Sequence, residues 1–180
     1  MASEGKREAI MDAFIAMIEE MPLESVHTEE LITRAGVSRS TFYRLFRDKY
    51  DVMNSIYLLH SKKMVYENPH LSNWKEWVRA DLPHIRRHIG FFRSVISYKG
   101  QNSFLDSAKE YYRDNMLRHI RKHFKEGDLP EEIAFSVDVY IQVSVFAVAW
   151  WIQGNCETPI ETLISYVEGC IPRRIRHFFD

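Results

Sequence analysis

The sequence predicts an all-α protein with a small N-terminal head of three helices and a larger helical bundle behind it. Apolar residues recur at spacings of three and four along most of the chain, which is the period of an amphipathic helix. Seven glycines and six prolines in 180 residues leave room for few turns. The most apolar run, residues 139–152, is also longer than an average strand. These three observations favour long helices over strands.

The composition is that of an ordinary globular protein, with 46% hydrophobic and 27% charged residues. A chain of 180 residues can bury a sizeable core. The net charge is only −1, so any binding to nucleic acid must come from a local positive patch. Two cysteines, Cys156 and Cys170, do not make a disulfide framework, and the polar start Met1–Arg7 does not resemble a signal peptide. A cytoplasmic protein is therefore expected.

Two helices are expected before residue 36. The first covers residues 4–21, ends at Pro22, and has one apolar stripe formed by Ile10, Phe14, Met17, Ile18 and Met21. The second is expected to start with Thr28 as its N-cap, followed by Glu29 and Glu30 in the first turn, where the helix dipole favours acids.

A tight turn and a short third helix follow at residues 35–47. Gly36 supplies the backbone freedom that the turn needs, and Ser38 is a good N-cap. Phe42 and Phe46 lie four residues apart and would face the core. The opposite face carries only hydrogen-bond donors and an aromatic hydroxyl, from Arg39, Ser40, Tyr43, Arg44 and Arg47.

Positive charge is concentrated in the same segment. Between Thr33 and Lys49 five basic residues stand against one acid, a balance of +4, whereas the segment before it is rich in glutamate. A helix of about eight residues is roughly 12 Å long, close to the width of the major groove of B-DNA. The pattern indicates binding to DNA phosphates, although a solvated helical hairpin would carry the same charges.

The order of these residues resembles the helix-turn-helix signature of the TetR (tetracycline repressor) family of transcriptional regulators. The resemblance covers about the first third of the chain and is carried by Ala35-Gly36-Val37-Ser38, Thr41-Phe42-Tyr43, Phe46 and Asp48-Lys49. It implies that the helix holding residues 39–46 is the recognition helix, in which Arg39, Ser40 and Thr41 would read base edges. Tyr43, Thr28 and Lys49 would hold phosphates. The predicted DNA-binding residues are therefore Thr28, Ser38, Arg39, Ser40, Thr41, Tyr43, Arg44 and Lys49.

A fourth helix should connect this head to the rest of the chain. Asp48 can cap it, with Asp51 three residues on in a loose capping box, and it would continue to Glu67. Residues 68–73 are polar and contain a proline, which makes them the clearest boundary in the sequence. The predicted domains are residues 1–67, which bind DNA, and residues 68–180, which regulate and dimerise.

The second domain should again be helical. Pro83 is expected to kink or break the helix that contains it. The apolar run of fourteen residues at 139–152 is too short to span a bilayer, so no membrane is expected. Thr158-Pro159-Ile160-Glu161 has the pattern of a capping box with proline at the first helical position. The helix that it opens would carry Ile171 and Ile175 and bend at Pro172.

A helix that is apolar on every side needs neighbours on every side, and one neighbour of the 139–152 run is plausibly a second copy of the chain. The helices within residues 131–179 resemble the pair that forms the dimeric four-helix bundle of TetR regulators, which implies a homodimer. Residues 91–105, from Phe91-Phe92-Arg93 to Asn102-Ser103-Phe104-Leu105, resemble the regulatory region of one subgroup. That subgroup includes an activator of dihydroxyacetone kinase genes.

Other constellations have simpler interpretations. The pairs His84/His88 and His119/His123 are spaced to share a metal ion, but both lie among arginines and lack a carboxylate or cysteine partner beside them, which favours solvated helix faces. The tryptophans and tyrosines could line a pocket for a flat apolar ligand, or fill the core and a dimer interface. No phosphate loop, nucleophile elbow or paired-cysteine site is present, so neither an enzyme nor a cofactor is expected.

The sequence thus predicts a homodimeric regulator that binds double-stranded DNA at a palindromic operator, with repression favoured over activation. A small-molecule effector acting on the second domain would change the spacing of the two heads, an expectation that rests on the resemblance alone. Two alternatives stay open. One is a protein-interaction module with a vestigial helix-turn-helix, and the other is a helical protein that binds a small ligand or a metal.

Overall fold

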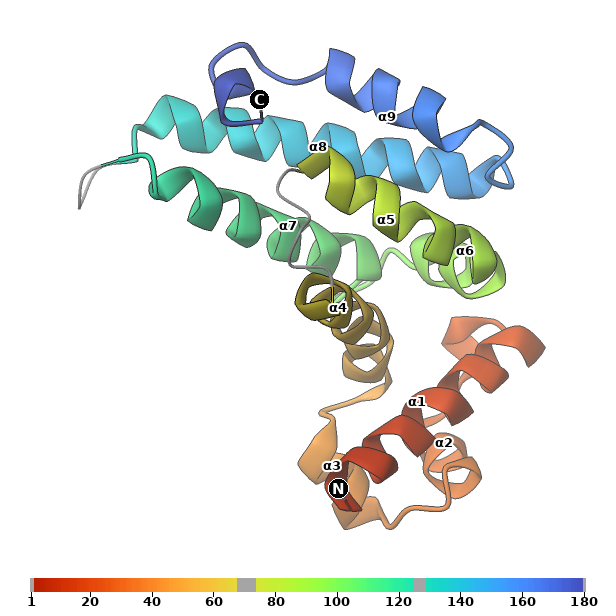
Figure 1. The fold of residues 1–180 in the computed structure, drawn as a ribbon. Helices are drawn as coiled ribbons and strands as arrows, with labels where there is room; N and C mark the ends of the chain where they lie inside the picture. The colour runs from red at the N-terminus through yellow and green to blue at the C-terminus, as the bar shows by residue number, and fades with distance from the viewer. Residues whose placement is uncertain (1, 68–73, 125–128, 180) are drawn as a thin grey trace. The chain divides into compact units, whose positions relative to one another are not determined.

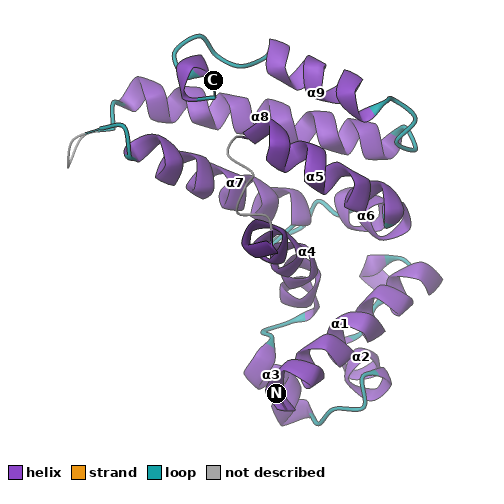
Figure 2. Ribbon diagram, in the orientation of Figure 1, coloured by secondary structure: helices purple, strands orange, loops and turns teal. Residues whose placement is uncertain are grey.

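The computed structural model describes residues 2–67, 74–124 and 129–179, and these residues are helical with short connections and no strand (Figures 1 and 2). The all-α prediction is confirmed. The predicted boundary at residues 68–73 lies outside the described residues. By contacts the chain forms two compact units. The first unit contains residues 1–67 and 90–104, and the second unit contains residues 68–89 and 105–180. The division into domains after residue 67 stays a prediction.

The first unit is built on four N-terminal helices, two of 19 residues and two of seven residues. Its elements are α1 (Ala2–Glu20), the 3-10 turn η1 (Leu23–Ser25), α2 (Thr28–Arg34), α3 (Arg39–Leu45), α4 (Lys49–Glu67) and most of α6 (Ile89–Ser97). The expected stripe of α1 is its core face, since Ile10, Phe14 and Met17 are fully buried. Leu31 of α2 and Phe42 of α3 are buried to the same extent. One apolar core therefore holds α3 in place.

Local hydrogen bonds define two of the helix starts that the sequence predicts. The Ser38 hydroxyl accepts a hydrogen bond from the Thr41 amide at 3.2 Å, which confirms Ser38 as the N-cap of α3. Asp48 accepts from the Asp51 amide at 2.8 Å, and Asp51 accepts in return from the Arg47 amide at 2.9 Å. The loose capping box is thus confirmed, except that Asp51 accepts from the amide of Arg47, one residue before the cap residue Asp48.

The expected N-cap of α2 is wrong by one residue. His27 has the extended backbone of an N-cap, with φ −96° and ψ 134°, and Thr28 is already the first helical residue. No side chain at the cap position makes a capping hydrogen bond. The two glutamates that follow still lie in the first turn, where the helix dipole favours them.

Residues 90–104 pack on α4 within the first unit. Tyr57 of α4 makes edge-to-face contacts with Phe92 and Phe104, at centroid distances of 5.8 and 5.3 Å. About two turns nearer the start of α4, Tyr50 stacks on Tyr98 at 4.8 Å. A hydrogen bond with Tyr98 raises the pKa of Tyr50 to about 12, with burial as the second cause. The segment after α6 is thereby fixed to α4, the helix that follows α3.

The second unit is a helical bundle centred on α8. Its elements are α5 (Trp74–Arg87), α7 (Phe104–Arg121), α8 (Glu131–Gln153), α9 (Ile160–Gly169) and the 3-10 turn η2 (Arg176–Phe178). In Figure 1, α8 lies between α7 and α9. Its buried side chains, among them Val137, Tyr140 and Ile141, share one cluster with Ile120 of α7 and Val167 of α9.

Two expectations for this unit are wrong, and a third is wrong in part. Pro83 lies inside α5, which continues to Arg87, so it does not break that helix, while a kink there stays a prediction. Pro159, with ψ 141°, is the N-cap of α9 and no side chain caps that helix, so the expected capping box is absent there. The helix α9 ends at Gly169, which leaves Ile171 and Ile175 buried in the turns that follow.

The helix α8 is longer than its apolar run, with 23 residues from Glu131 to Gln153. By length and composition alone it could cross a membrane, so the argument from a run of fourteen residues does not hold. The core helix of a soluble protein passes the same test. Here one side of α8 forms the centre of the bundle, as the buried Tyr140 and Ile141 show.

The contact between Tyr50 and Tyr98 can be tested through Gly100. A Cβ at Gly100 would lie 2.1 Å from the Tyr98 hydroxyl oxygen, so Gly100→Ala should displace that ring. Without the hydrogen bond from Tyr98, the pKa of Tyr50 should fall from about 12 towards the ordinary value near 10, as followed by phenolate absorbance against pH. The matched control is Gly90→Ala, since a Cβ there meets nothing within 4 Å. An unchanged titration in Gly100→Ala would refute the contact.

Candidate nucleic-acid interface

The predicted recognition helix α3 is preceded by a turn that requires glycine. Gly36 has φ +63°, in the left-handed region that side chains with a Cβ rarely adopt. Its amide donates to the Thr33 carbonyl at 3.1 Å, and the Val37 amide donates to the Ile32 carbonyl at 3.3 Å. These bonds close the end of α2. The turn therefore sets where α3 begins.

A cation from α1 holds the other end of α3. The Arg7 guanidinium donates to the Leu45 carbonyl at 3.2 Å and lies 4.6 Å from the centroid of the Phe46 ring. Carbonyls in the last turn of a helix have no intrahelical partner, so a donor there stabilises the end of the helix. Sequence analysis missed this residue, because 38 positions separate it from its acceptor.

Lys49 is also used within the protein. Its ammonium donates to the carbonyls of Leu23, Glu24 and Val26, at 2.9, 3.1 and 2.8 Å. Burial lowers the pKa of Lys49, with a smaller opposing effect of the Glu24 carboxylate. An ammonium has three protons, and three carbonyls accept them here. In this arrangement Lys49 fastens the start of α4 to η1 and has no donor left for a phosphate.

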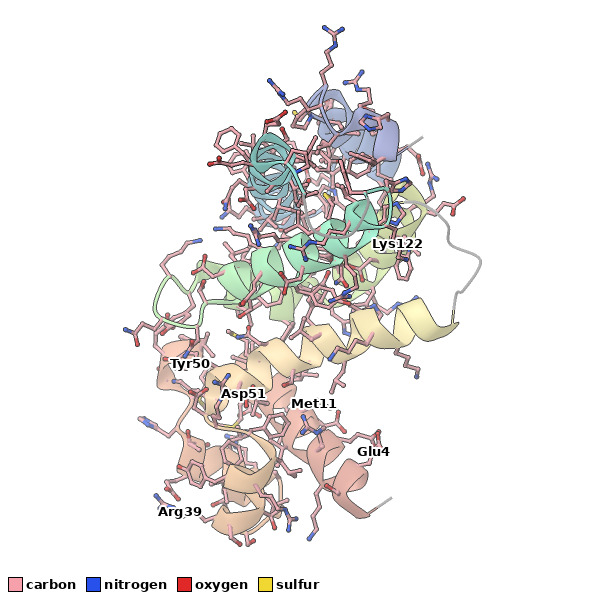
Figure 3. All side chains as sticks on the ribbon, turned by 90° about the vertical axis from the view of Figure 1, so that its left-hand side faces the viewer. Glu4, Met11, Arg39, Tyr50, Asp51 and Lys122 are labelled. Atoms are coloured by element: carbon pink, nitrogen blue, oxygen red, sulfur yellow. The ribbon has the colours of Figure 1, made fainter. Side chains whose placement is uncertain are left out.

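Four of the predicted DNA-binding residues are brought together on the outer side of α3. We name this surface the exposed α3 face, and it consists of Arg39, Ser40, Tyr43 and Arg44. Tyr43 is 47% exposed, and its ring packs edge-to-face on the buried Phe42. The Arg39 side chain is 69% exposed (Figure 3). Guanidinium, hydroxyl and phenol groups on one short helix can donate to base edges and phosphates.

The other predicted residues lie at the margin of this face or beneath it. Thr41 is only 8% exposed, and its hydroxyl accepts a hydrogen bond from the Ser38 hydroxyl at 2.9 Å. Ser38 and Thr41 thus form the cap of α3. Thr28 is half-buried at the first position of α2.

The positive charge of this segment is partly neutralised by nearby acids. Arg34 lies 2.6 Å from Glu20 and 2.8 Å from Glu30, and its hydrogen bonds to these carboxylates raise its pKa. Arg39 lies 2.7 Å from Glu29 on α2. The balance of +4 between residues 33 and 49 therefore overstates the positive charge that DNA would meet, because acids that precede residue 33 in sequence form ion pairs with these arginines.

The histidine pairs are close without forming a metal site. The ring centroids of His84 and His88 lie 4.6 Å apart, and those of His119 and His123 lie 5.7 Å apart. Within the described ranges, no group of three or more His, Cys, Asp or Glu residues could hold a metal ion. His123 instead packs against Phe178 at 5.2 Å.

Comparison with known proteins gives two family models that match this chain. The model described as "Bacterial regulatory proteins, tetR family" matches residues 10–56, and the model described as "Transcriptional regulator C-terminal region" matches residues 72–172. The solved structure titled "Dihydroxyacetone kinase operon activator DhaS" is similar over 97% of this chain and 98% of its own, with a TM-score of 0.64 and 14% identity. At that identity the similarity concerns the fold. No curated protein sequence matches the chain.

The internal role of Lys49 predicts a loss of stability when it is replaced. Lys49→Met should lower the free energy of unfolding by about 1–3 kcal/mol, because three carbonyls lose a charged donor. Urea unfolding followed by circular dichroism would measure it. The control is Arg47→Met, whose side chain is 87% exposed with a carboxylate at 3.8 Å, and which should change stability little. Unchanged stability in Lys49→Met, together with weaker DNA binding, would restore the phosphate contact and refute the internal role.

Proposed function

Because the chain belongs to the TetR family of transcriptional regulators, which bind DNA and are not enzymes, we propose that it is a repressor that binds a palindromic operator as a homodimer. The observation that carries this proposal is the exposed α3 face, where four donor side chains lie on a helix held from below by a buried core. The chain would act in the cytoplasm, where its operator lies.

The proposed contacts follow from the side chains on that face. A helix of seven residues is about 10 Å long and fits the major groove. Arg39 and Ser40, in the first turn of α3, would read base edges, since the N-terminal residues of a recognition helix reach deepest. Tyr43 and Arg44 would hold phosphates on the flanking backbone, and Thr28 would hold one from the start of α2. Ser38, Thr41 and Lys49 would position α3 rather than touch DNA.

An exposed apolar stripe on α8 supports the homodimer. Phe146 is 70% exposed and Phe135 is 67% exposed, although both are large apolar side chains. The stripe consists of Phe135, Val139, Phe146 and Trp150, and Tyr166 of α9 is exposed as well. Large apolar patches of this kind mark interaction surfaces, and a two-fold dimer buries the same patch twice. The helices within residues 131–179 would therefore form a four-helix bundle with those of a second copy.

Such a dimer presents two α3 helices to one duplex. Successive major grooves on one side of B-DNA are about 34 Å apart, which would set the spacing of the half-sites. A small-molecule effector would act by changing that spacing. The packing of Tyr57 of α4 against Phe92 of α6 supports this step, because α6 follows α5 in sequence after a single residue.

DNA binding can be tested with a duplex selected from a random library by the full-length protein. Arg44→Ala should weaken binding and reduce the slope of log affinity against log salt by about 0.9, because one phosphate contact is lost. Fluorescence anisotropy at several salt concentrations measures both. Arg121→Ala, an exposed arginine at the end of α7, is the control and should change neither value. Failure to select any duplex would favour an interaction module with a vestigial helix-turn-helix.

The dimer can be tested by placing a charge in the stripe. Phe146→Glu should shift the protein from dimer to monomer in analytical ultracentrifugation, because a carboxylate would be buried at the interface. Leu59→Glu adds the same charge at a 38% exposed leucine of α4 and should leave the dimer intact. A dimer that survives in Phe146→Glu would exclude this surface as the interface.

A further inference from the structure

An ion pair joins the exposed α3 face to the preceding helix. Glu29 Oε1 of α2 lies 2.7 Å from Nη1 of Arg39, and the two side chains are 65% and 69% exposed. On another side, the Arg39 guanidinium lies 5.6 Å from the centroid of the Tyr43 ring. One carboxylate and one aromatic ring thus restrict the Arg39 guanidinium.

We propose that Glu29 is a specificity-determining residue that orients Arg39 towards a guanine. This inference rests on the proposed function and adds to it a residue that does not itself carry positive charge. A guanidinium has five N–H donors, and the carboxylate engages it at Nη1. The edge formed by Nε and Nη2 is the fork that matches the O6 and N7 acceptors of guanine in the major groove.

The orienting contact should act differently on bases and on phosphates. Holding Arg39 in one orientation lowers the entropy lost when it binds a guanine bidentately. A guanidinium can bind a phosphate from many directions, so a fixed orientation of Arg39 does not increase its affinity for phosphates. The Glu29 charge also repels phosphates near Arg39, and non-specific binding depends almost entirely on phosphates. Glu29 should therefore strengthen binding to the operator and weaken binding to other DNA.

The neighbouring glutamate supplies a comparison within the same turn of α2. Glu30 pairs with Arg34, which also pairs with Glu20 of α1, so this network holds α1 and α2 together. Glu29 and Glu30 have the same charge and adjacent positions in sequence. Only Glu29 is paired with a residue of the exposed α3 face among the described ion pairs.

The test compares Glu29→Gln with Glu30→Gln on two probes, the duplex selected by the wild-type full-length protein and a pool of random duplexes of equal length. Glu29→Gln should bind the selected duplex about two- to fivefold more weakly and the random pool about twofold more tightly. Glu30→Gln should keep the wild-type ratio of the two affinities. Thermal unfolding of each variant would show whether it is folded.

A second pair of variants ties the effect to the guanidinium. Arg39→Lys keeps the charge but loses the fork, so it should lose the preference for guanine at one operator position, and adding Glu29→Gln to it should not reduce that preference further. Equal tightening of both probes by Glu29→Gln would mean that Glu29 only competes with DNA and would overturn the inference, as would a ratio equal to that of Glu30→Gln. Failure of the wild-type protein to select any duplex would instead refute the proposed function.

Discussion

The orientation of α3 depends on cations that bind backbone carbonyls within the first unit. Lys49 joins the start of α4 to three carbonyls of residues 23–26, and Arg7 joins α1 to the last turn of α3. Carbonyls in the last turn of an α-helix have no intrahelical partner, so Arg7 satisfies one such acceptor at the end of α3. The Ser38 cap fixes the start of α3 and Arg7 binds its last turn, so a helix of seven residues, too short to be stable by itself, can present a fixed surface.

This use of cations explains what the sequence could and could not predict about the site. The exposed α3 face and the caps at Ser38 and Asp48 depend on spacings of three or four residues, which are visible in sequence. Lys49 contacts residues 23 to 26 positions earlier in the chain, and Arg7 contacts a residue 38 positions later. The periodicity of the sequence therefore does not reveal these contacts. The predicted N-caps of α2 and α9 are wrong for another reason: His27 and Pro159 occupy the cap positions, and neither helix has the side-chain capping bond on which the prediction relied.

In the second unit, too, the sequence pattern predicts a helix but does not predict how that helix packs. The sequence predicted that the apolar helix now seen as α8 needs neighbours on every side, and that a second copy would be one of them. It could not predict which side each neighbour takes, because almost every side chain there is apolar. In the structure Val137, Tyr140 and Ile141 face α7 and α9, whereas Phe135 and Phe146 are left exposed. The packing of α7 and α9 against α8 decides which side is buried, and the sequence pattern of α8 alone does not reveal it.

The positive charge of residues 33–49 is the property for which the sequence and the structure differ most. Counting residues 33–49 gives +4, yet Arg34 is paired with Glu20 and Glu30, Arg39 is paired with Glu29, and Lys49 is bound to carbonyls. A surface with few unpaired cations gains little binding free energy from contacts with phosphates, so its affinity for DNA of arbitrary sequence should be low. Selective binding to an operator then depends on geometry, meaning the direction in which each donor is held. If α3 binds DNA as proposed, the acid Glu29 beside it is not a defect of the surface, because its ion pair would fix the direction of the Arg39 donors.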